Sequence, residues 1–204
     1  MKKLLGLFLT MAMVVSLTAC GKKQAENDGE SLPAEGSTTE DASYDESATD
    51  YGVGVTMAEI KEALVSSFGE DYWPNTEIPE DMLKDIYGVS ADMYEEYFGE
   101  IPMISTNVDT VLIVKAKEGQ VEAVEDALNT YRDAMVSDTM QYPMNVGKIQ
   151  ASRIESFGQY VCFVQLGADT MDALENGDDA VIEQCQQANE QALEVIQNTL
   201  AKNQ

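Results

Sequence analysis

Asp138 is the acidic residue whose position most suggests chemistry, because it falls on the edge of an apolar stripe between Met135 and Tyr142. A carboxylate there must find a partner or be desolvated at a cost. Arg132, Arg153 or a tyrosine hydroxyl such as that of Tyr142 could supply that partner. One interpretation is a general acid or an ion ligand. The alternative, which we favour, is a hydrogen bond or salt bridge at the end of a helix.

Two further groups of residues could recognise a ligand. Lys115 and Lys117 would project from one face of a strand and, with Lys148, could form a basic patch for a carboxylate or phosphate. We favour the alternative in which each lysine neutralises a neighbouring acid. The segment Tyr72-Trp73-Pro74 could stack on a glycan. Loop aromatics more often pack back onto their own domain, and we favour that interpretation here.

Several chemistries are disfavoured by what the chain contains. It has no histidine, which removes Ser-His-Asp and Cys-His catalysis and histidine-based zinc sites. Glu95, Glu96 and Glu100 are close in sequence, but their spacing matches no metal or glycosidase motif. Asn176-Gly177-Asp178-Asp179 lacks the calcium-loop pattern, and the many methionines are more typical of core packing than of a copper site. We therefore predict no metal site and no cofactor.

Cys20 lies at the end of an N-terminal segment with the features of an export signal. Two lysines precede an apolar run from Leu4 to Leu17, which is too short for a transmembrane helix of about 20 residues and typical of a signal peptide. Leu17-Thr18-Ala19-Cys20 resembles the lipobox of bacterial lipoproteins. That resemblance implies cleavage between Ala19 and Cys20 and a diacylglyceryl thioether on Cys20, with an additional N-acyl chain left open. An ordinary secretory signal would end in an Ala-x-Ala-like site instead.

Residues 20–54 are predicted to be the lipidated cysteine followed by a disordered acidic linker. The segment is rich in Asp, Glu, Ser and Thr, and it cannot bury enough apolar surface to offset its ordering entropy. The formal net charge of the whole chain is −25. This charge disfavours nucleic acid as a partner, because phosphates would be repelled. The expected partners are the membrane, through the lipid anchor, and an unidentified protein or cell-wall component.

Cys162 and Cys185 are the remaining cysteines. They could form a disulfide, because an extracytoplasmic compartment is oxidising. We favour the alternative of two apolar thiols in the core.

Residues 55–204 are predicted to form a single α+β domain. Thr56 and Glu59 form a capping box for a helix over 57–68, and two short helices are expected at 79–88 and 90–99. Strands are expected at 110–117, 149–156 and 160–166, with a long helix over 119–142 and a C-terminal helix from about 178. This order predicts a three-stranded β-α-β-β-α sheet with two long helices on one face. The N-terminal helices or a second subunit would cover the other face.

A resemblance to a protein family covers about the last 150 residues. It rests on the order and spacing of Ile86-Tyr87-Gly88-Val89-Ser90, Tyr94 and Tyr97, Ile101-Pro102-Met103, Val114-Lys115, and Tyr142-Pro143. This pattern resembles a family of uncharacterised lipoproteins of Gram-positive anaerobes, a domain of unknown function. The resemblance implies a fold and a location, and it supplies no catalytic residue.

The sequence therefore predicts a lipoprotein anchored on the extracytoplasmic face of a cell membrane. We expect a non-catalytic binding or assembly module. The alternatives are a small-ligand or cation-binding accessory protein, or a cell-wall enzyme that uses carboxylates alone.

Overall fold

The computed structural model describes residues 51–202. The predictions for the signal segment, for Ala19 and Cys20, and for the acidic linker up to residue 50 lie outside these residues. The elements, in chain order, are α1 (Met57–Phe68), a 3-10 turn (Gly69–Asp71), β1 (Thr76–Glu77), α2 (Glu80–Asp85), β2 (Tyr94–Ile101), β3 (Thr110–Ala116), α3 (Val121–Ser137), α4 (Pro143–Ala151), β4 (Arg153–Phe157), β5 (Tyr160–Gln165), α5 (Met171–Leu174) and α6 (Asp178–Leu200).

The strands form one antiparallel sheet in the order β1-β2-β3-β5-β4. The α+β class is confirmed, and the prediction of a three-stranded sheet is wrong because β1 and β2 extend it. β3 and β5 lie side by side in the middle, with Ile113 opposite Cys162. Their residues are apolar on both faces, as expected for strands covered on both sides. β3 and β4 run in the same direction, and β5 is inserted between them.

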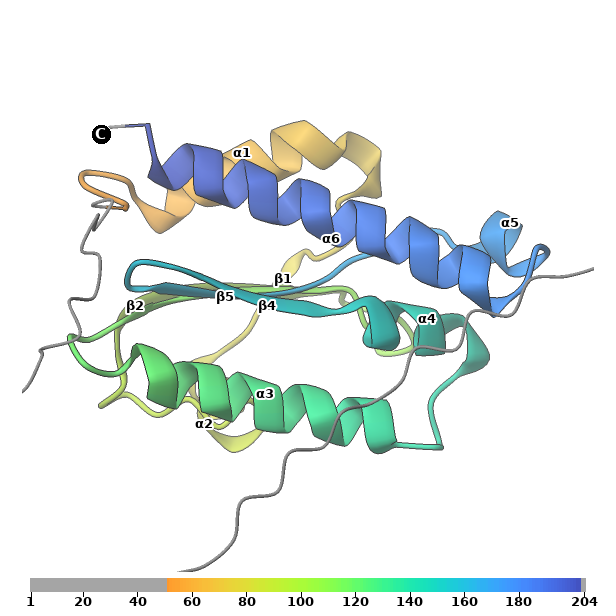
Figure 1. Cartoon of the computed structure of the whole chain (residues 1–204), viewed down its shortest axis with the longest axis horizontal. Coiled ribbons are helices and arrows are strands. Elements are labelled where there is room, and N and C mark those ends of the chain that lie inside the picture. Colours follow the sequence, from red (N-terminus) through yellow and green to blue (C-terminus); the bar gives the residue numbers. More distant parts are fainter. Residues whose placement is uncertain (1–50, 203–204) are drawn as a thin grey trace, which may run out of the picture. The chain divides into compact units, whose positions relative to one another are not determined.

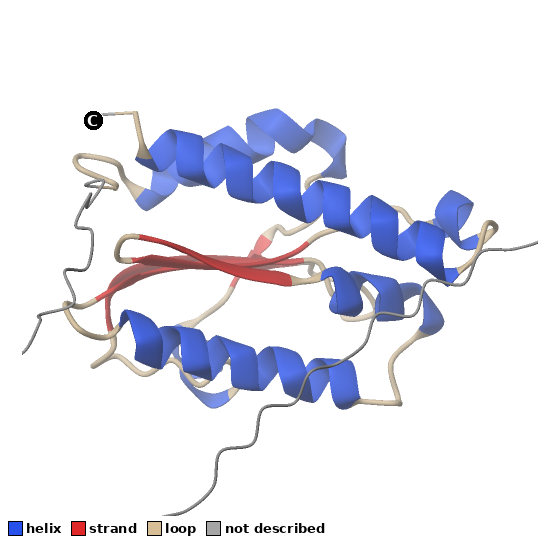
Figure 2. Cartoon of the chain, viewed as in Figure 1, coloured by secondary structure: helices blue, strands red, loops and turns tan. Residues whose placement is uncertain are grey.

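The sheet lies between two layers of helices (Figures 1 and 2). α1 and α6 cover one face, where Ile60 and Ile196 pack against Val111 and Val164. α2 and α3 cover the other face, where Leu83, Val124 and Leu128 belong to a second cluster with the strand residues of that face. The prediction that both long helices share one face is therefore wrong. Each face of the central strands carries an apolar row, and each row requires its own helix.

The prediction of a helix at residues 90–99 is wrong, because strand β2 begins at Tyr94. The apolar spacing of Tyr94, Tyr97 and Phe98 fits a helical period, but a register shift between Tyr94 and Glu96 produces the same spacing in a strand. A bulge of this kind adds one residue to the strand, so Tyr94 and Tyr97 belong to one cluster with ring centroids 5.3 Å apart. Pairing with β3 therefore overrides the local pattern.

The long helix and the strand after it have different limits from those predicted. α3 ends at Ser137, and Pro143 opens a separate helix, α4. α4 includes residues 149–151, the start of the predicted strand, and β4 begins only at Arg153. Proline suits the first turn of a helix because it lacks an N–H to satisfy. The capping box of α1 and the β4–β5 hairpin are confirmed. Of the helices between residues 51 and 202, none is long and apolar enough to cross a membrane.

Candidate functional site

Asp138 lies at the exposed C-terminal end of α3 and does not line either of the two main cavities of the described domain. Its carboxylate accepts hydrogen bonds from the backbone N–H of Met140 and the side-chain amide of Gln141, each at 2.8 Å. Both partners are within three residues, so the carboxylate stabilises the turn that ends the helix. Arg132 is not its partner. The guanidinium donates instead to the carbonyl and hydroxyl of Ser152 and links α3 to the end of α4.

The remaining predicted candidates are separated on the surface. Arg153 lies on β4 at the sheet edge and makes exposed ion pairs with Glu155 and Glu190. Tyr142 is exposed and precedes the first turn of α4. Neither contacts Asp138 in the described part of the chain, so the structure does not bring these residues into one site.

The three lysines considered for a basic patch lie apart. Lys115 pairs with Glu95 at 2.9 Å, and Lys117 donates to the carbonyl of Ala91. Lys148 is buried on α4 and contacts Asp109, which precedes the other end of β3. Six strand residues separate the two ends by about 20 Å. The lysines therefore neutralise or bind local partners and form no common patch.

A cavity of about 520 Å³ opens at the end of the domain where α4, α5 and the segment after β2 meet. We call it the end cavity. Most of its accessible surface is apolar. Its walls come from four segments of the chain: Tyr72, Trp73 and Asn75; Pro102, Met103, Ile104, Thr106 and Asn107; Met144, Asn145 and Lys148; and Ala168, Asp169, Thr170 and Met171.

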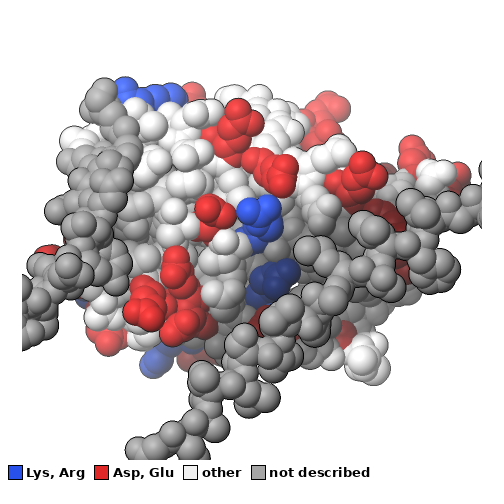
Figure 3. Space-filling model, in the orientation of Figure 1, with Lys and Arg blue, Asp and Glu red and all other residues white. Residues whose placement is uncertain are grey.

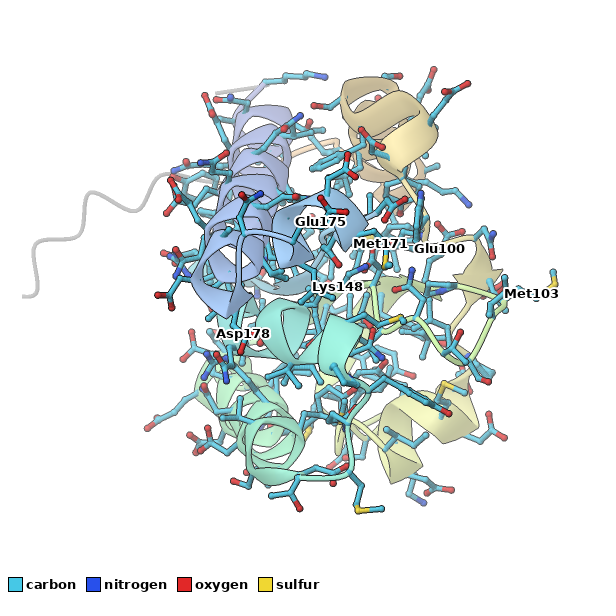
Figure 4. All side chains as sticks on the ribbon, turned by 90° about the vertical axis from the view of Figure 1, so that its right-hand side faces the viewer. Glu100, Met103, Lys148, Met171, Glu175 and Asp178 are labelled. Carbon is cyan, nitrogen blue, oxygen red and sulfur yellow. The ribbon has the colours of Figure 1, made fainter. Side chains whose placement is uncertain are left out.

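The rim of the end cavity carries long apolar side chains that are left in solvent. Met103 is 79% exposed, and Ile104, Met144 and Met171 are also exposed. In Figure 4, which faces this end, Lys148 lies near the centre, Met171 lies close to it, and Met103 points outward at the edge. Exposed apolar residues gathered around a cavity are typical of a binding surface, and methionine adapts to varied ligand shapes.

A buried ion pair lies beside the floor of the end cavity. The Lys148 ammonium lies 2.6 Å from Asp109 Oδ1, and the side chains are 3% and 0% exposed. Lys148 also donates to the carbonyl of Ala168 at 2.6 Å and to Asn107 Oδ1 at 3.4 Å. Burial raises the pKa of Asp109, while Lys148 and the backbone N–H groups of Gly167 and Ala168 oppose that rise. The three acceptors use all three donors of the ammonium group.

The backbone around this pair is tightly fitted. A Cβ on Gly147 would lie 2.5 Å from Val181 Cγ1, so the missing side chain lets α4 approach α6 closely. A Cβ on Gly167 would lie 2.7 Å from Cys185 Sγ. Ala168 has φ of +47°, a left-handed conformation that costs a non-glycine residue roughly 1–2 kcal/mol. Contacts on both sides hold it there, because its N–H donates to Asp109 while its carbonyl accepts from Lys148.

Two ion pairs hold Tyr72 and Trp73, which together we call the aromatic wall of the end cavity. Glu100, itself buried, accepts from the Tyr72 hydroxyl at 3.1 Å and pairs with Lys61. The Lys148 ammonium lies 5.2 Å from the centroid of the Trp73 ring, a distance at which a cation is attracted to the ring face. Tyr72-Trp73 is thus anchored to the domain, as favoured from the sequence, yet both residues also line the end cavity.

Two buried polar side chains of the wall have uncommitted groups. Asn145 is 2% exposed and donates to the carbonyl of Thr106, but its Oδ1 accepts no hydrogen bond from residues 51–202. Thr170 is 4% exposed, and its hydroxyl makes no hydrogen bond within the same range. Neither atom is sealed from solvent. Both are therefore available to a molecule in the end cavity.

The other candidate chemistries do not converge on a site in the described domain. Glu95 and Glu96 face Lys115, whereas Glu100 faces Lys61. Within residues 51–202, no group of three or more Cys, Asp or Glu side chains is placed to hold a metal ion. Cys162 and Cys185 are free and buried in different clusters, and burial raises the pKa of Cys185 to about 11.

The sequence interpretation did not identify the Lys148–Asp109 pair, because the two residues are 39 positions apart. One signal was present, since Lys148 interrupts the apolar residues of its segment and Asp109 immediately precedes the apolar strand β3. Each charge would be costly to bury alone. The two buried charges could therefore have been predicted to form an ion pair with each other.

Comparison with known proteins identifies a domain within the chain. A domain of the family described as Domain of unknown function (DUF4358) is found at residues 67–166. This range includes β1 to β5 and most of the end cavity walls, but excludes most of α1 and all of α5 and α6. The expected resemblance to a family without an established activity is confirmed at this level. No curated protein and no solved structure matches the chain.

Proposed function

We propose that this protein is a lipid-anchored, extracytoplasmic binding protein that holds the apolar part of a small ligand in the end cavity. The observation that carries the proposal is the cavity itself: about 520 Å³, mainly apolar, and lined by a few polar groups. Ligand sites in proteins have this volume, this apolar character and this small number of placed polar groups. The role is binding without turnover.

The polar lining supports binding rather than hydrolysis. Asp169 is the only carboxylate among the residues that line the end cavity. An enzyme that uses carboxylates alone would require two of them on either side of the reacting bond. Asp138, the acid nominated from the sequence, stabilises a turn elsewhere. A binding role requires none of these groups to react.

The single tryptophan of the chain provides the test, because Trp73 lines the end cavity. The probe is 4-phenylbutan-1-ol, a neutral molecule with an apolar body, added to protein produced without residues 1–20. We expect a saturable change in Trp73 fluorescence. Thr106→Phe should weaken it at least tenfold by filling the cavity mouth, since the Thr106 side chain is exposed and lines the cavity. A tenfold loss is about 1.4 kcal/mol.

Thr130→Phe is the matched control, because Thr130 is an exposed threonine on α3 outside the lining. It should leave the affinity for 4-phenylbutan-1-ol unchanged. A fluorescence response that both variants preserve would place the probe elsewhere and contradict the proposal. The absence of any response in the parent protein would contradict it as well.

The anchoring part of the proposal rests on Leu17-Thr18-Ala19-Cys20 and the apolar run before it. Two acyl chains hold a protein stably at a membrane, because each buried methylene contributes about 0.8 kcal/mol. Cys20→Ser in the full chain should prevent acylation, measured as loss of a radiolabelled fatty acid from the protein. Cys162→Ser, a cysteine outside the motif, should retain the label. Equal labelling of the parent and Cys20→Ser would refute the anchor.

A further inference from the structure

We infer that the end cavity selects amphipathic amines, molecules that join an apolar body to a positive charge. The inference rests on the proposed function and specifies the ligand class of the same site. It follows from which charged groups at the end cavity have no ionic partner within the domain.

The cavity offers no free positive charge. Lys148 is the only basic residue among those that line it. Its three N–H donors are used by Asp109, by the carbonyl of Ala168 and by Asn107. Asp109 also neutralises its charge at 2.6 Å. An anionic ligand would have to break this buried pair, and a buried charge left without its partner is strongly destabilising.

The negative charge at the cavity is free. Asp169 lines the cavity and is exposed. One of its oxygens accepts from the backbone N–H of Met171, and it has no ion pair with any residue between 51 and 202. Glu175 and Asp178 lie on the same end of the domain (Figure 4) and likewise have no ionic partner there. Figure 3 shows how acidic side chains outnumber basic ones on the adjoining face.

The uncommitted buried groups can accept hydrogen bonds from an ammonium group. Asn145 Oδ1 is a pure acceptor, and its orientation is set because Nδ2 donates to the carbonyl of Thr106. The Thr170 hydroxyl can accept as well. Both side chains are more than nine-tenths buried and line the cavity. An amine with two or three N–H donors satisfies them without disturbing Lys148.

The aromatic wall also favours a positively charged ligand. The face of an indole ring carries partial negative charge and attracts cations. Trp73 already makes this contact with Lys148 at 5.2 Å. The apolar rim of Met103, Ile104 and Met171 can then cover the apolar body of the ligand. The cavity therefore combines apolar contact, acceptors and a free carboxylate, which together define an amphipathic amine.

Three probes with one apolar body test the inference: 4-phenylbutylammonium, 4-phenylbutan-1-ol and 4-phenylbutyrate. Each is titrated at low ionic strength into protein produced without residues 1–20, and the affinity is measured from Trp73 fluorescence. The three hydrophobic clusters of the described domain are formed by residues 51–200, so this protein retains them. We expect the ammonium compound to bind roughly tenfold more tightly than the carboxylate, with the alcohol between them.

Asp169→Asn should weaken ammonium binding about threefold and strengthen carboxylate binding by a similar factor, since it removes the free charge and keeps the acceptor for Met171. Glu122→Gln is the matched control, because Glu122 is an exposed acid in the first turn of α3, outside the cavity lining. It should change neither affinity.

The possible outcomes separate the two proposals. Equal affinities for the three probes, or a preference for the carboxylate, would overturn the inference and leave the proposed function standing. An ammonium preference that Glu122→Gln reduces as much as Asp169→Asn would overturn it too, because the attraction would then come from the net charge of the chain. If no probe changes Trp73 fluorescence, the proposed function fails and the inference fails with it.

Discussion

The two ends of β3 carry the same kind of ion pair in opposite surroundings. Before the strand, Asp109 and Lys148 are 2.6 Å apart and nearly inaccessible to solvent. At the far end, Lys115 and Glu95 are 2.9 Å apart, and their side chains are 27% and 47% exposed. An exposed pair contributes little to stability, whereas removing one member of a buried pair leaves an uncompensated charge. The contrast shows that similar ion pairs are buried at one end of β3 and solvated at the other.

The backbone around the buried pair is closely fitted. Gly147 and Gly167 give room to Val181 and Cys185, and Ala168 is held in a left-handed conformation by the buried pair. Residues in costly backbone conformations persist only where the surroundings determine them, and they concentrate at functional sites. The backbone beside the end cavity is therefore preorganised around the buried pair.

Breaking the buried pair should have the largest effect. Lys148→Met leaves Asp109 buried without its partner and should lower the free energy of unfolding by about 3–5 kcal/mol. The measurement is chemical denaturation followed by circular dichroism. Asp109→Leu combined with Lys148→Met should recover a large part of the loss, because the buried charge is then absent. A loss below about 1 kcal/mol for Lys148→Met would make the two ends of β3 equivalent.

Crowding α4 against α6 should have the next largest effect. Gly147→Ala places a methyl group 2.5 Å from Val181 Cγ1, and overpacking of this kind costs about 1–3 kcal/mol. The better helix propensity of alanine offsets up to about 1 kcal/mol of that cost. Thermal unfolding measures the difference. Val181→Ala in the same chain removes the contacted methyl groups and should reduce the penalty of Gly147→Ala; an unchanged penalty would contradict the close approach.

Removing the exposed pair should cost less than about 1 kcal/mol. The hydrogen bond that Lys115 donates to Glu95 raises the pKa of Lys115. The stability that this pair contributes is therefore fully present below the ordinary lysine pKa. It is lost as the pH rises through the raised pKa of Lys115. Lys115→Met should lower stability slightly at neutral pH and low salt. Denaturation at high salt should show a smaller difference because the ions screen the pair; a difference independent of salt would indicate packing instead.

Relaxing the backbone at Ala168 should have the smallest effect, in the opposite direction. Glycine adopts φ of +47° without strain, but it also gains entropy in the unfolded chain. We expect Ala168→Gly to stabilise the domain by about 0.5 kcal/mol. Ala134→Gly, at an exposed helical position on α3, should instead destabilise it by about 1 kcal/mol. Equal losses at both positions would show that Ala168 is not strained.

Local patterns predicted the elements whose signals are contained within a few residues. Thr56 and Glu59 form the capping box, Gly158 adopts the positive φ of the β4–β5 turn, and the apolar run from Thr110 forms a central strand. The prediction for β2 was wrong because its bulge imitates helical spacing. Which face each helix covers depends on contacts between distant segments, and the periodicity of one helix does not contain that information.

The end cavity was harder to predict for the same reason. Sequence patterns indicate Trp73 as a possible ligand contact and Lys148 as part of a possible basic patch, but they contain no link between the two residues. Their contact requires α4 to lie over the end of β3, and that position depends on Gly147 meeting Val181 on α6. Four separate segments supply the wall, so a motif within any one of them could not reveal the cavity.

The two edges of the sheet have a consequence for proteins held at high local density. An open edge strand exposes unpaired backbone groups that can pair with another molecule and begin aggregation. On one edge, β1 pairs with only Glu100 and Ile101 of β2, and the rest of β2 carries exposed charges at Glu95 and Glu96. β4 forms the other edge and carries exposed charges at Arg153 and Glu155. Short strands and charged side chains both discourage edge-to-edge pairing, so neighbouring domains can crowd together without joining their sheets.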